Sequence, residues 1–589
     1  MTNQFPQRGR ASRRRILIWR KSIPLILALA LACPWPGVAT PAIAAHDDSS
    51  KRGLDPIRGY ISNAWDTLTR SLTKCETVVD PKLQASSMLY IPADFPVPES
   101  VSELQKQCSF QVLHLPKVIH GPGEIDSNKI DPQGLLYLPN SYVVPGGRFN
   151  EMYGWDSYFI IRGLVQDGRI DLARGMVENF FFEIEHYGTI LNANRSYYLT
   201  RSQPPFLTSM ILAVYDAQKA AGHEDRAWLE KGYGYAAKDY AMWVREPHLA
   251  GTTGLSRYYD FGDGPTPESV KDETGYYRKV ATYFLLHPAQ DDGYIVVDNE
   301  RKPDQPILGR EYTVQVCDAA TTIARPDCEP SAAVSLSADY YKGDRAMRES
   351  GYDISFRFGP FSAATHHYAP VCLNSLLYKT ETDLEEMSRI LGRAEEAEKW
   401  HARAEDRKEK IQKYLWDGQR GLFFDYDFEK QTRSSYDFIT TFFPLWVGLA
   451  TPDQARAVVQ NIKIFEQPGG LAMSAHESEG QWDFPYEWAP DQLPADEGMR
   501  RYGFNDEANK TSYEFLSTVA ENFRRDGTIR EKYDAVTRSS ETHVTVGYHT
   551  NVVGFGWTNG VFLVLLHELP PDWVERLAKE QDAPLPMAK

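Results

Sequence analysis

The sequence predicts an all-α fold in which pairs of helices form a closed ring and long loops gather at one end. Amphipathic segments of helical period recur along most of the chain. Long loops rich in Gly, Pro, Trp and Tyr separate these segments, and no low-complexity linker divides the chain after about residue 80. Because long loops inside a compact domain usually carry function, we expect one large helical domain with a site built from its loops.

The clearest helix signal lies in residues 393–416, where apolar side chains recur at helical spacing among charged ones. These apolar residues are Ala397, Trp400, Ala404, Ile411 and Leu415. Similar patterns, with Pro near the start and Gly near the end of several, predict further helices. The further helices cover residues 204–222, 224–246, 452–462 and 509–527. The expected loops include residues 254–273 and 469–490.

Length and composition indicate a globular protein with a large core. The chain has 589 residues, of which 42% are hydrophobic and 24% charged, and these proportions exclude a disordered or fibrous chain. Aromatic residues make up 12% of the chain, which exceeds the usual need for packing. The surplus of Tyr and Trp therefore hints at a surface for stacking or for binding sugars.

The first 45 residues have the composition of an export signal. A basic stretch precedes an apolar run at residues 23–33, and Ala-Ile-Ala at residues 42–44 fits a cleavage site. The apolar run is too short to span a bilayer. Residues 12–18 also fit a twin-arginine signal, and acylation of Cys33 is an alternative. We expect a periplasmic or secreted protein.

Acidic residues dominate the remaining chain. Removal of residues 1–45, which carry seven basic and no acidic residues, would change the formal net charge from −16 to −23. A surface that negative repels phosphate backbones and anionic lipids. We therefore expect neither nucleic acid nor membrane partners after removal of the signal, and we expect a monomer.

Five cysteines follow residue 45, and four of them form candidate pairs. In an oxidising compartment, Cys75 with Cys108 and Cys317 with Cys328 are plausible disulfides. Cys372 is then left as an apolar filler. No CxxC motif or Cys/His cluster has the spacing of a metal site.

The adjacent histidines His366 and His367 are also considered as metal ligands. Because one helix face presents residues three or four apart, it cannot present both of these side chains. The sequence therefore predicts no metal role for this pair.

Three segments share an unusual mixture of planar rings, Arg, Asn and carboxylates. Residues 145–159 read PGGRFNEMYGWDSYF, and residues 191–205 and 480–490 have a similar composition. Buried charges without partners are costly, so this mixture is not typical of a core. Sugars offer hydroxyl groups to bidentate partners and C–H faces to aromatic rings. The three segments therefore predict a sugar-binding site.

These segments resemble a known family. PGGRFNEMYGWDSY and QWDFPYEWAP look like the two signatures of the α,α-trehalases, glycoside hydrolases that cleave trehalose. The further blocks NRSYYLTRSQPP, GLSRYYD, ESGYDISFRF, EKYD and GFGWTNGV follow in the family's order, and the resemblance spans residues 137–566. It implies an (α/α)6 barrel and an inverting hydrolysis of trehalose to two glucose molecules, without a cofactor. The expected domains are the signal 1–45, a lead-in 46–80, the catalytic domain 81–570 and a tail 571–589.

The resemblance also implies the catalytic pair. Asp353 corresponds to the family's general acid and Glu531 to its general base. An inverting glycosidase holds such carboxyl groups about 6.5–9.5 Å apart, which leaves room for a water molecule. Asp353 must keep its proton near neutral pH, so we expect burial among Tyr352, Phe356 and Phe358 to raise its pKa. Asp534 and Glu541 are nearby carboxylates that could be confused with Glu531.

The positions that match sugar-contacting residues of the family come from several blocks, with Phe149 and Trp482 expected as walls of the pocket. They are Arg148, Phe149, Trp155, Asp156, Asn192, Arg201, Ser202, Gln203, Glu268, Gly351 and Trp482.

Three departures from the family pattern are expected in loops over the pocket. Thr266 stands where the family usually has an Arg, and Glu487 replaces a Gly. Residues 535–553 differ from the family's glycine-rich lid, whose glutamate aligns with either Glu541 or Tyr548. These changes are expected to alter the second glucose subsite and to weaken the affinity for trehalose.

Two alternatives to a trehalase are a hydrolase of another α-glucoside on the same scaffold and a non-catalytic sugar-binding protein. Retention of both candidate carboxylates favours an enzyme.

Overall fold

The computed structural model describes residues 53–79, 87–267, 275–297, 309, 311–314, 332–547 and 550–582. The chain divides into two units, residues 1–49 and 50–589, and all described residues belong to the second. The expected export segment, Glu268, Tyr548 and the candidate pair Cys317 and Cys328 lie outside the described residues.

The helices of the second unit form an (α/α)6 barrel, as the sequence predicts. Each inner helix contacts the next one, and the last contacts the first. The inner helices are, in order around the ring, α4 (Asp156–Gln166), α6 (Leu207–Ala220), α11 (Val371–Ile390), α13 (Phe443–Trp446), α15 (Ala489–Arg501) and α17 (Gly556–Glu568).

Outer helices cover this ring. One outer helix packs on α4 and α6, another on α6 and α11, a third on α11, and a fourth on α15 and α17. They are, in that order, α5 (Ile170–His186), α7 (Arg226–Trp243), α12 (Ala394–Tyr414) and α16 (Asn505–Asp526). Helix α14 (Pro452–Gln460) follows α13 along the chain.

The segments with the strongest helical period are helices in the structure. Helix α12 buries Ala397, Trp400, Ala404 and Ile411, the apolar stripe of residues 393–416. Helices α6, α7, α14 and α16 lie within or close to the other predicted segments, and α16 begins four residues earlier than expected. The period of the apolar residues therefore locates these helices within a few residues.

The ring closes where α4 meets α17 at two glycines. A Cβ atom at Gly163 would lie 2.4 Å from Cα of Gly560, and one at Gly560 would lie 2.1 Å from the carbonyl oxygen of Phe159. Neither position has room for a side chain, so the two helices approach at backbone distance. Buried residues occupy almost every position of α17.

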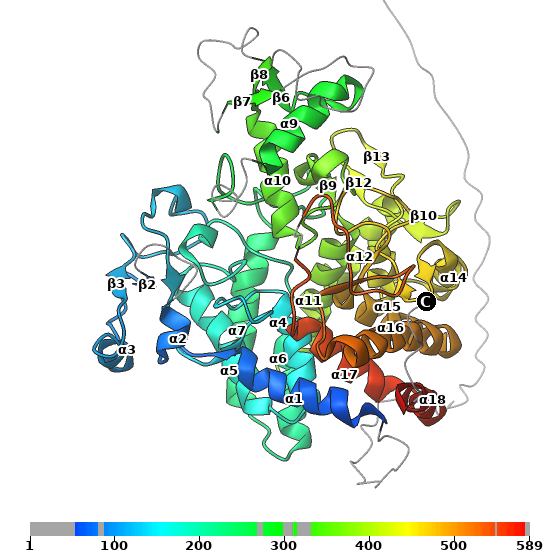
Figure 1. The fold of residues 1–589 in the computed structure, drawn as a ribbon, viewed down its shortest axis with the longest axis horizontal. Helices are drawn as coiled ribbons and strands as arrows, with labels where there is room; N and C mark the ends of the chain where they lie inside the picture. Colours follow the sequence, from blue (N-terminus) through cyan, green and yellow to red (C-terminus); the bar gives the residue numbers. More distant parts are fainter. Residues whose placement is uncertain are drawn as a thin grey trace, which may run out of the picture. The chain divides into compact units, whose positions relative to one another are not determined.

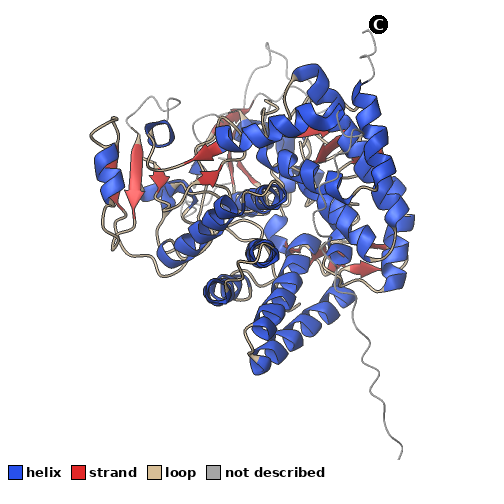
Figure 2. Ribbon diagram, turned by 90° about the horizontal axis from the view of Figure 1, so that it is seen from below, coloured by secondary structure: helices blue, strands red, loops and turns tan. Residues whose placement is uncertain are grey.

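Short strands lie among the loops between helices (Figure 2). Strand β2 pairs in parallel with β3 and β4, whereas the other paired strands are antiparallel. The sheets are β3 (Gln111–His114), β2 (Met88–Ile91), β4 (Leu135–Leu136); β1 (Thr69–Arg70), β5 (Tyr142–Val143); β13 (Thr432–Arg433), β12 (Tyr426–Asp427), β9 (Tyr368–Ala369); β10 (Trp416–Asp417), β11 (Leu422–Phe423); β14 (Glu466–Gln467), β15 (Gly470–Leu471); and β16 (Tyr486–Trp488), β17 (Lys532–Asp534).

A smaller hydrophobic cluster surrounds α9 (Tyr276–Leu286) and α10 (Ala338–Glu349). Strand β8 (Ala332–Leu336) pairs there with β6 (Ile295–Val297) and β7 (Tyr312–Val314), and α9 packs against this sheet (Figure 1). Aromatic side chains such as Tyr277, Phe284 and Tyr340 fill the cluster. This packing fixes α10, which leads into the candidate acid Asp353.

Both ends of the described chain pack on the barrel. Helix α1 (Asp55–Leu68) contacts α17 and buries Trp65, and α18 (Pro571–Asp582) contacts α16. The short helices α2 (Cys75–Val78) and α3 (Glu99–Leu104) flank a disulfide between Cys75 and Cys108, whose Cα atoms are 5.8 Å apart. This pairing is confirmed, and Cys372 is free and buried, as expected. Among the described helices, none has both the length and the apolar character needed to cross a membrane.

Candidate active site

A pocket lies where loops lead into the N-terminal ends of inner helices. Its volume is about 630 Å³, including its opening to solvent. Its lining comes from six segments that are separated in the sequence, and both candidate catalytic carboxyl groups belong to it. The lining residues are Pro145, Phe149, Tyr153, Trp155, Asp156, Asn192, Tyr198, Arg201, Gln203, Arg348, Gly351, Asp353, Gln481, Trp482, Trp488, Glu531, Phe555 and Trp557.

The structure brings most of the sequence-predicted site residues together in this pocket. The predicted residues in its lining are Phe149, Trp155, Asp156, Asn192, Arg201, Gln203, Gly351, Asp353, Trp482 and Glu531. Arg148 lies instead in an adjoining outer cavity. Ser202 lines neither cavity; its hydroxyl donates to the carbonyl of Ile190 (2.7 Å) and its backbone N–H to Glu349 (3.2 Å). Glu268 lies outside the described residues.

Four tryptophans form one wall of the pocket. Trp482 and Trp488 stack with ring centroids 3.9 Å apart and an interplanar angle of 8°. Trp155 and Trp557 meet this pair edge-on or tilted, at centroid distances of 5.7 to 6.2 Å. Such rings offer faces to the C–H groups of a sugar.

Trp155 is held from two sides. Its backbone N–H donates to Oε1 of Gln203 (2.9 Å), which ties the start of α4 to the loop before α6. Gly351 has a positive φ of +81°, and a Cβ atom there would lie 2.8 Å from the Trp155 ring. A side chain at Gly351 would therefore strain the backbone and displace the ring.

Asp353 lies on an irregular loop that follows α10. Its backbone carbonyl accepts a hydrogen bond from Nε2 of Gln481 (2.6 Å). The next residues are held by the same distant segment: Trp482 N–H donates to the Ile354 carbonyl (3.2 Å), and Phe356 N–H donates to Oδ2 of Asp483 (2.8 Å). The segment QWDF therefore shapes the loop that carries the candidate acid.

Two buried carboxyl groups support this loop. Burial raises the pKa of Asp483 to about 6, although hydrogen bonds from Ser478, Tyr436 and Phe356 favour its ionised form. Burial also raises the pKa of Asp491 to about 7, and its Oδ1 accepts from the hydroxyl of Tyr352 (3.1 Å). Tyr352 is the neighbour of Asp353 and packs against Trp155 and Trp482.

Glu531 lies directly before strand β17 and is only 4% exposed. Its backbone N–H donates to the carbonyl of Val552 (3.0 Å), and its carbonyl accepts from Nε1 of Trp557 (3.2 Å). Strand β16 pairs with β17 beside it, with Trp488 opposite Lys532. Backbone contacts therefore hold the candidate base.

Lys532 supplies a buried positive charge beside Glu531. Its Nζ lies 3.5 Å from Oε2 of Glu531 and 4.8 Å from the centroid of the Trp488 ring. The Lys532 side chain is fully buried, and burial lowers its pKa, whereas Glu531 acts to raise it. Lys532 and Glu531 therefore form a buried ion pair at the edge of the pocket.

Gln481 joins the two sides of the pocket. Its Nε2 donates to the Asp353 carbonyl, and its Oε1 accepts from Nζ of Lys532 (3.1 Å). Lys532 in turn contacts Glu531. A continuous set of polar contacts thus runs from the loop of the candidate acid to the carboxylate of the candidate base.

Asp156 begins helix α4 inside the pocket. Burial raises its pKa well above the usual value, and the charges of Glu531 and Asp353 raise it further. Asp156 is 4% exposed and belongs to the lining of the pocket.

Cationic side chains line the pocket and its outer cavity. Arg201 is buried and lies with its guanidinium 4.7 Å from the centroid of the Tyr198 ring. Arg348, at the end of α10, lines both cavities and donates to Oδ2 of Asp344 (3.3 Å). Guanidinium groups suit the adjacent hydroxyls of sugars.

The outer cavity forms a wider mouth beside Asp353 and Arg348. Part of it comes from the lid segment that departs from the family pattern: Thr545, Val546, Gly547 and Thr550 line it. The start of α9, with Tyr276 and Lys279, contributes another part. Nζ of Lys279 donates to the carbonyl of Thr545 (3.1 Å), which ties α9 to the lid segment.

Two of the three departures do not lie over the pocket. Thr266 is fully buried, and its backbone N–H donates to the hydroxyl of Tyr277 (3.1 Å). Glu487 is fully buried on β16, and burial raises its pKa well above the usual value. The expectation that both residues lie in loops over the pocket is therefore wrong, because strand pairing and aromatic packing enclose them. Glu541 is exposed and outside both cavities.

The sequence interpretation missed several lining residues. Gln481, Trp488, Phe555 and Trp557 all lie in the matched blocks, so only their roles were missed. Arg348 directly precedes the block ESGYDISFRF. A cation one helical turn after a carboxylate, as Arg348 follows Asp344, usually indicates an exposed pair, and this pattern gave no signal for a pocket.

Comparison with known proteins identifies similar chains. The Trehalase family model matches residues 50–296 and 331–570. A probable trehalase of Eremothecium gossypii is 35% identical over 581 residues, covering 88% of this chain and 73% of the relative. A cytosolic neutral trehalase of Saccharomyces cerevisiae is 34% identical, covering 85% and 70%. The solved structure of neutral trehalase Nth1 from Saccharomyces cerevisiae is 33% identical, with a TM-score of 0.72 over 90% of this chain and 96% of that one.

These relatives correct one prediction. Several of them are named cytosolic neutral trehalases, which contradicts the expectation of a periplasmic or secreted protein. That expectation depended only on a succession of basic, apolar and small residues, a composition that is not specific to export. The signal peptide, its twin-arginine variant and acylation of Cys33 have no support from these relatives.

Proposed function

Because the chain belongs to the trehalase family of glycoside hydrolases, we propose that it hydrolyses α,α-trehalose with inversion, using Asp353 as general acid and Glu531 as general base. The observation that carries this proposal is that both carboxyl groups line one pocket from separate segments. Asp353 protonates the oxygen of the leaving glucose while Glu531 removes a proton from the attacking water.

The surroundings of Glu531 support its role as the base. A general base must be ionised before it can take a proton, and the buried ammonium group of Lys532 lies 3.5 Å from its carboxylate. Oε1 of Gln481 accepts a hydrogen bond from the same ammonium group, which holds the Lys532 charge beside Glu531.

The surroundings of Asp353 support its role as the acid. The loop that carries it borders both the pocket and the outer cavity. A leaving glucose that occupies the outer cavity would therefore lie beside Asp353, while the glucose under attack occupies the pocket with the tryptophan wall. Arg148 and Arg348 would bind hydroxyl groups of the leaving glucose.

Phe149, Trp155, Asp156, Asn192, Arg201, Gln203, Gly351 and Trp482 line the pocket and are proposed to contact the first glucose or shape its subsite. Ser202 is proposed to act indirectly, by fixing the loop between Asn192 and Gln203. The protein needs no cofactor for this reaction and is proposed to act as a monomer.

The stereochemistry of the products tests the mechanism. Proton NMR of a fresh reaction mixture should show one β-glucose and one α-glucose for each trehalose, before mutarotation equilibrates them. Initial release of two α-anomers would exclude inversion and assign Glu531 a different role. Glu531→Gln measured in parallel provides the background rate.

A substrate panel tests the assignment of trehalose. We expect kcat/KM for trehalose to exceed that for maltose, kojibiose and an aryl α-glucoside. If one of these exceeds trehalose tenfold or more, the outer cavity is built for another aglycone. The family, the fold and the catalytic pair would stand in that case.

A further inference from the structure

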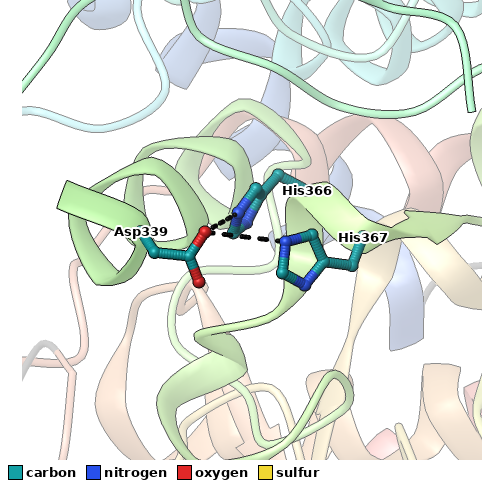
Figure 3. Close-up of side chains that lie close together, drawn as sticks. All are labelled: Asp339, His366 and His367. Carbon is teal, nitrogen blue, oxygen red and sulfur yellow. Dashed lines mark hydrogen bonds and ion pairs between the residues drawn. The ribbon is translucent and has the colours of Figure 1, made fainter. Parts of the chain in front are cut away.

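A cluster of three side chains outside the pocket has the composition of a metal site. Asp339, His366 and His367 direct a carboxylate oxygen and two imidazole nitrogens toward one another (Figure 3). Among the described residues, this is the group of His, Cys, Asp and Glu side chains whose potential ligand atoms converge in this way, all within 4.8 Å of one another.

The three residues come from two segments. Asp339 lies in the first turn of α10, and both histidines lie in the short 3-10 helix Thr365–His367. The sequence argument against a metal considered a single helix face. The structure instead brings the carboxylate of another helix to both rings, whose centroids are 3.9 Å apart.

The distances fit a small transition-metal ion. Nε2 of His366 lies 2.9 Å and Nε2 of His367 lies 3.6 Å from Oδ1 of Asp339. In tetrahedral zinc sites, bonds of about 2.0–2.1 Å place neighbouring ligand atoms roughly 3.3 Å apart. The two measured distances bracket this value, so small rotations of the side chains would complete the geometry.

A hydrogen-bond network alone explains the cluster less well. A single carboxylate oxygen faces both nitrogens, and the His367 nitrogen lies too far away for a hydrogen bond to it. His366 is buried, whereas the side chain of Asp339 is 48% exposed. A buried ligand beside an exposed one gives an ion both a low-dielectric partner and a route from solvent.

Charges around the cluster act in both directions. Burial raises the pKa of Tyr294, and the charges of Asp292 and Asp339 raise it further. The guanidinium of Arg257 donates to the backbone carbonyl of His366 (2.9 Å) and places a positive charge near that histidine. Two imidazoles and a carboxylate suit Zn²⁺, Co²⁺ or Ni²⁺ better than Mg²⁺ or Ca²⁺, which prefer oxygen ligands.

We propose that Asp339, His366 and His367 bind one divalent transition-metal ion of the zinc type, with water in the remaining position. The ion would join the start of α10 to the turn at residues 365–367. The segment that carries Arg348 and Asp353 lies between these two points in the sequence. The ion would therefore hold the two ends of this segment together. Arg348 is nine residues along α10, about 14 Å from Asp339, so the ion would not touch the reacting atoms.

The surroundings of His366 limit the affinity of the cluster for a metal ion. Nδ1 of His366 is buried and has no hydrogen-bond partner among the described residues. Metal-bound histidines usually donate this second N–H to an acceptor, and loss of such a partner typically weakens metal binding 10–100-fold. We therefore expect reversible binding that a strong chelator reverses.

Isothermal titration of the full, untagged chain with Zn²⁺ after removal of metals by EDTA tests the proposal. Wild type should bind one equivalent with saturation. Asp339→Asn and His367→Ala should each weaken this event at least tenfold. His401→Gln should leave it unchanged, since His401 faces Glu385 in an exposed pair at 3.2 Å and provides a matched control.

Two further measurements distinguish a loss of metal binding from a loss of folding in the variants. Zn²⁺ should raise the Tm of wild type and of His401→Gln, but not that of Asp339→Asn, because only a ligand that binds the native state stabilises it. Binding should weaken as pH falls and protons compete for the imidazoles. The proposal is overturned if no saturable binding occurs, or if all four proteins bind Zn²⁺ equally, which would indicate adventitious binding elsewhere.

Discussion

The two sides of the pocket hold their carboxyl groups in different ways. Asp353 lies on an irregular loop whose shape depends on side chains of a distant segment, chiefly Gln481 and Asp483. Glu531 lies at the edge of a paired strand, and its own backbone N–H and carbonyl are both hydrogen-bonded. The acid side is thus positioned chiefly by side chains of a distant segment, whereas the base side is fixed by strand pairing and by the Trp557 side chain.

The electrostatic surroundings differ as well. Lys532 interacts more strongly with Glu531 than with Asp353. A nearby cation favours a carboxylate and disfavours a carboxylic acid. The comparison teaches that one buried lysine can separate the roles of two carboxyl groups in one pocket, because it interacts more strongly with one of them.

The largest effect is expected when either carboxyl group is neutralised. Asp353→Asn and Glu531→Gln should each lower kcat for trehalose by several orders of magnitude, roughly 10³-fold or more, since each removes one proton transfer. α-Glucosyl fluoride distinguishes the two, because fluoride leaves without being protonated. Asp353→Asn should hydrolyse it at a rate near that of wild type, whereas Glu531→Gln should not. Equal losses on both substrates would contradict the assignment of roles.

Removal of the lysine should have the next largest effect. Lys532→Met keeps most of the volume beside Trp488 but loses the positive charge that lies 3.5 Å from the Glu531 carboxylate. Because this charge contacts both the general base and Gln481, kcat for trehalose at neutral pH should fall roughly tenfold. Lys410→Met, at an ion pair with Asp406, provides the control. An unchanged kcat would show that Lys532 only fills space.

Gln481 is the link between the two sides, and its replacement should have a moderate effect. Gln481→Met loses both contacts, whereas Gln481→Glu keeps an acceptor for Lys532 and loses the donor to the Asp353 carbonyl. A lost buried hydrogen bond typically costs about 1–3 kcal/mol, so kcat should fall roughly tenfold or more in Gln481→Met. If the Met variant keeps full activity, the loop of Asp353 holds its conformation without this contact.

The smallest effect on activity is expected at Asp491, beneath the acid side. Its pKa of about 7 in the folded protein lies above the value of about 3.9 in the unfolded chain. Between these values the folded state holds a proton that the unfolded state has lost, so its contribution to stability falls as pH rises from about 4 to 7. Asp491→Asn keeps an acceptor for Tyr352 and should remove this slope.

Chemical denaturation at several pH values measures the contribution of Asp491. The stability of Asp491→Asn relative to wild type should increase from pH 4 to pH 7, by about 4 kcal/mol at most. Activity at neutral pH should change less than threefold. A relative stability that does not vary with pH would mean that Asp491 titrates alike in the folded and unfolded chains.

The sequence predicts well those parts of the fold that have one buried and one exposed face. Helix α12 is an example, because its apolar stripe repeats with the helical period. Helix α17 gave no such signal, since partners surround it on nearly every side and no polar face remains. The short strand pair β16–β17 was also missed, because three residues are too few to show alternation.

The site residues follow the same logic. Asp353 and Glu531 came from matched blocks, and both line the pocket. Arg348 was missed because its spacing from Asp344 is typical of an exposed helix pair, and only the packing of α9 and α10 reveals its position. Thr266 was placed wrongly because a block match gives the order of residues but not their burial.

The contact between Gly163 and Gly560 has a consequence for how the chain is made. Helix α4 lies early in the sequence, and α17 follows all the other inner helices. During synthesis α4 therefore lacks its partner α17 until the rest of the ring has been translated. Until α17 leaves the ribosome, the surface of α4 around Gly163 is uncovered and Trp557 is missing from the tryptophan wall. The barrel therefore completes its binding pocket and its closure in one late event, and a nascent chain that stalls before α17 would expose apolar surface to chaperones and proteases.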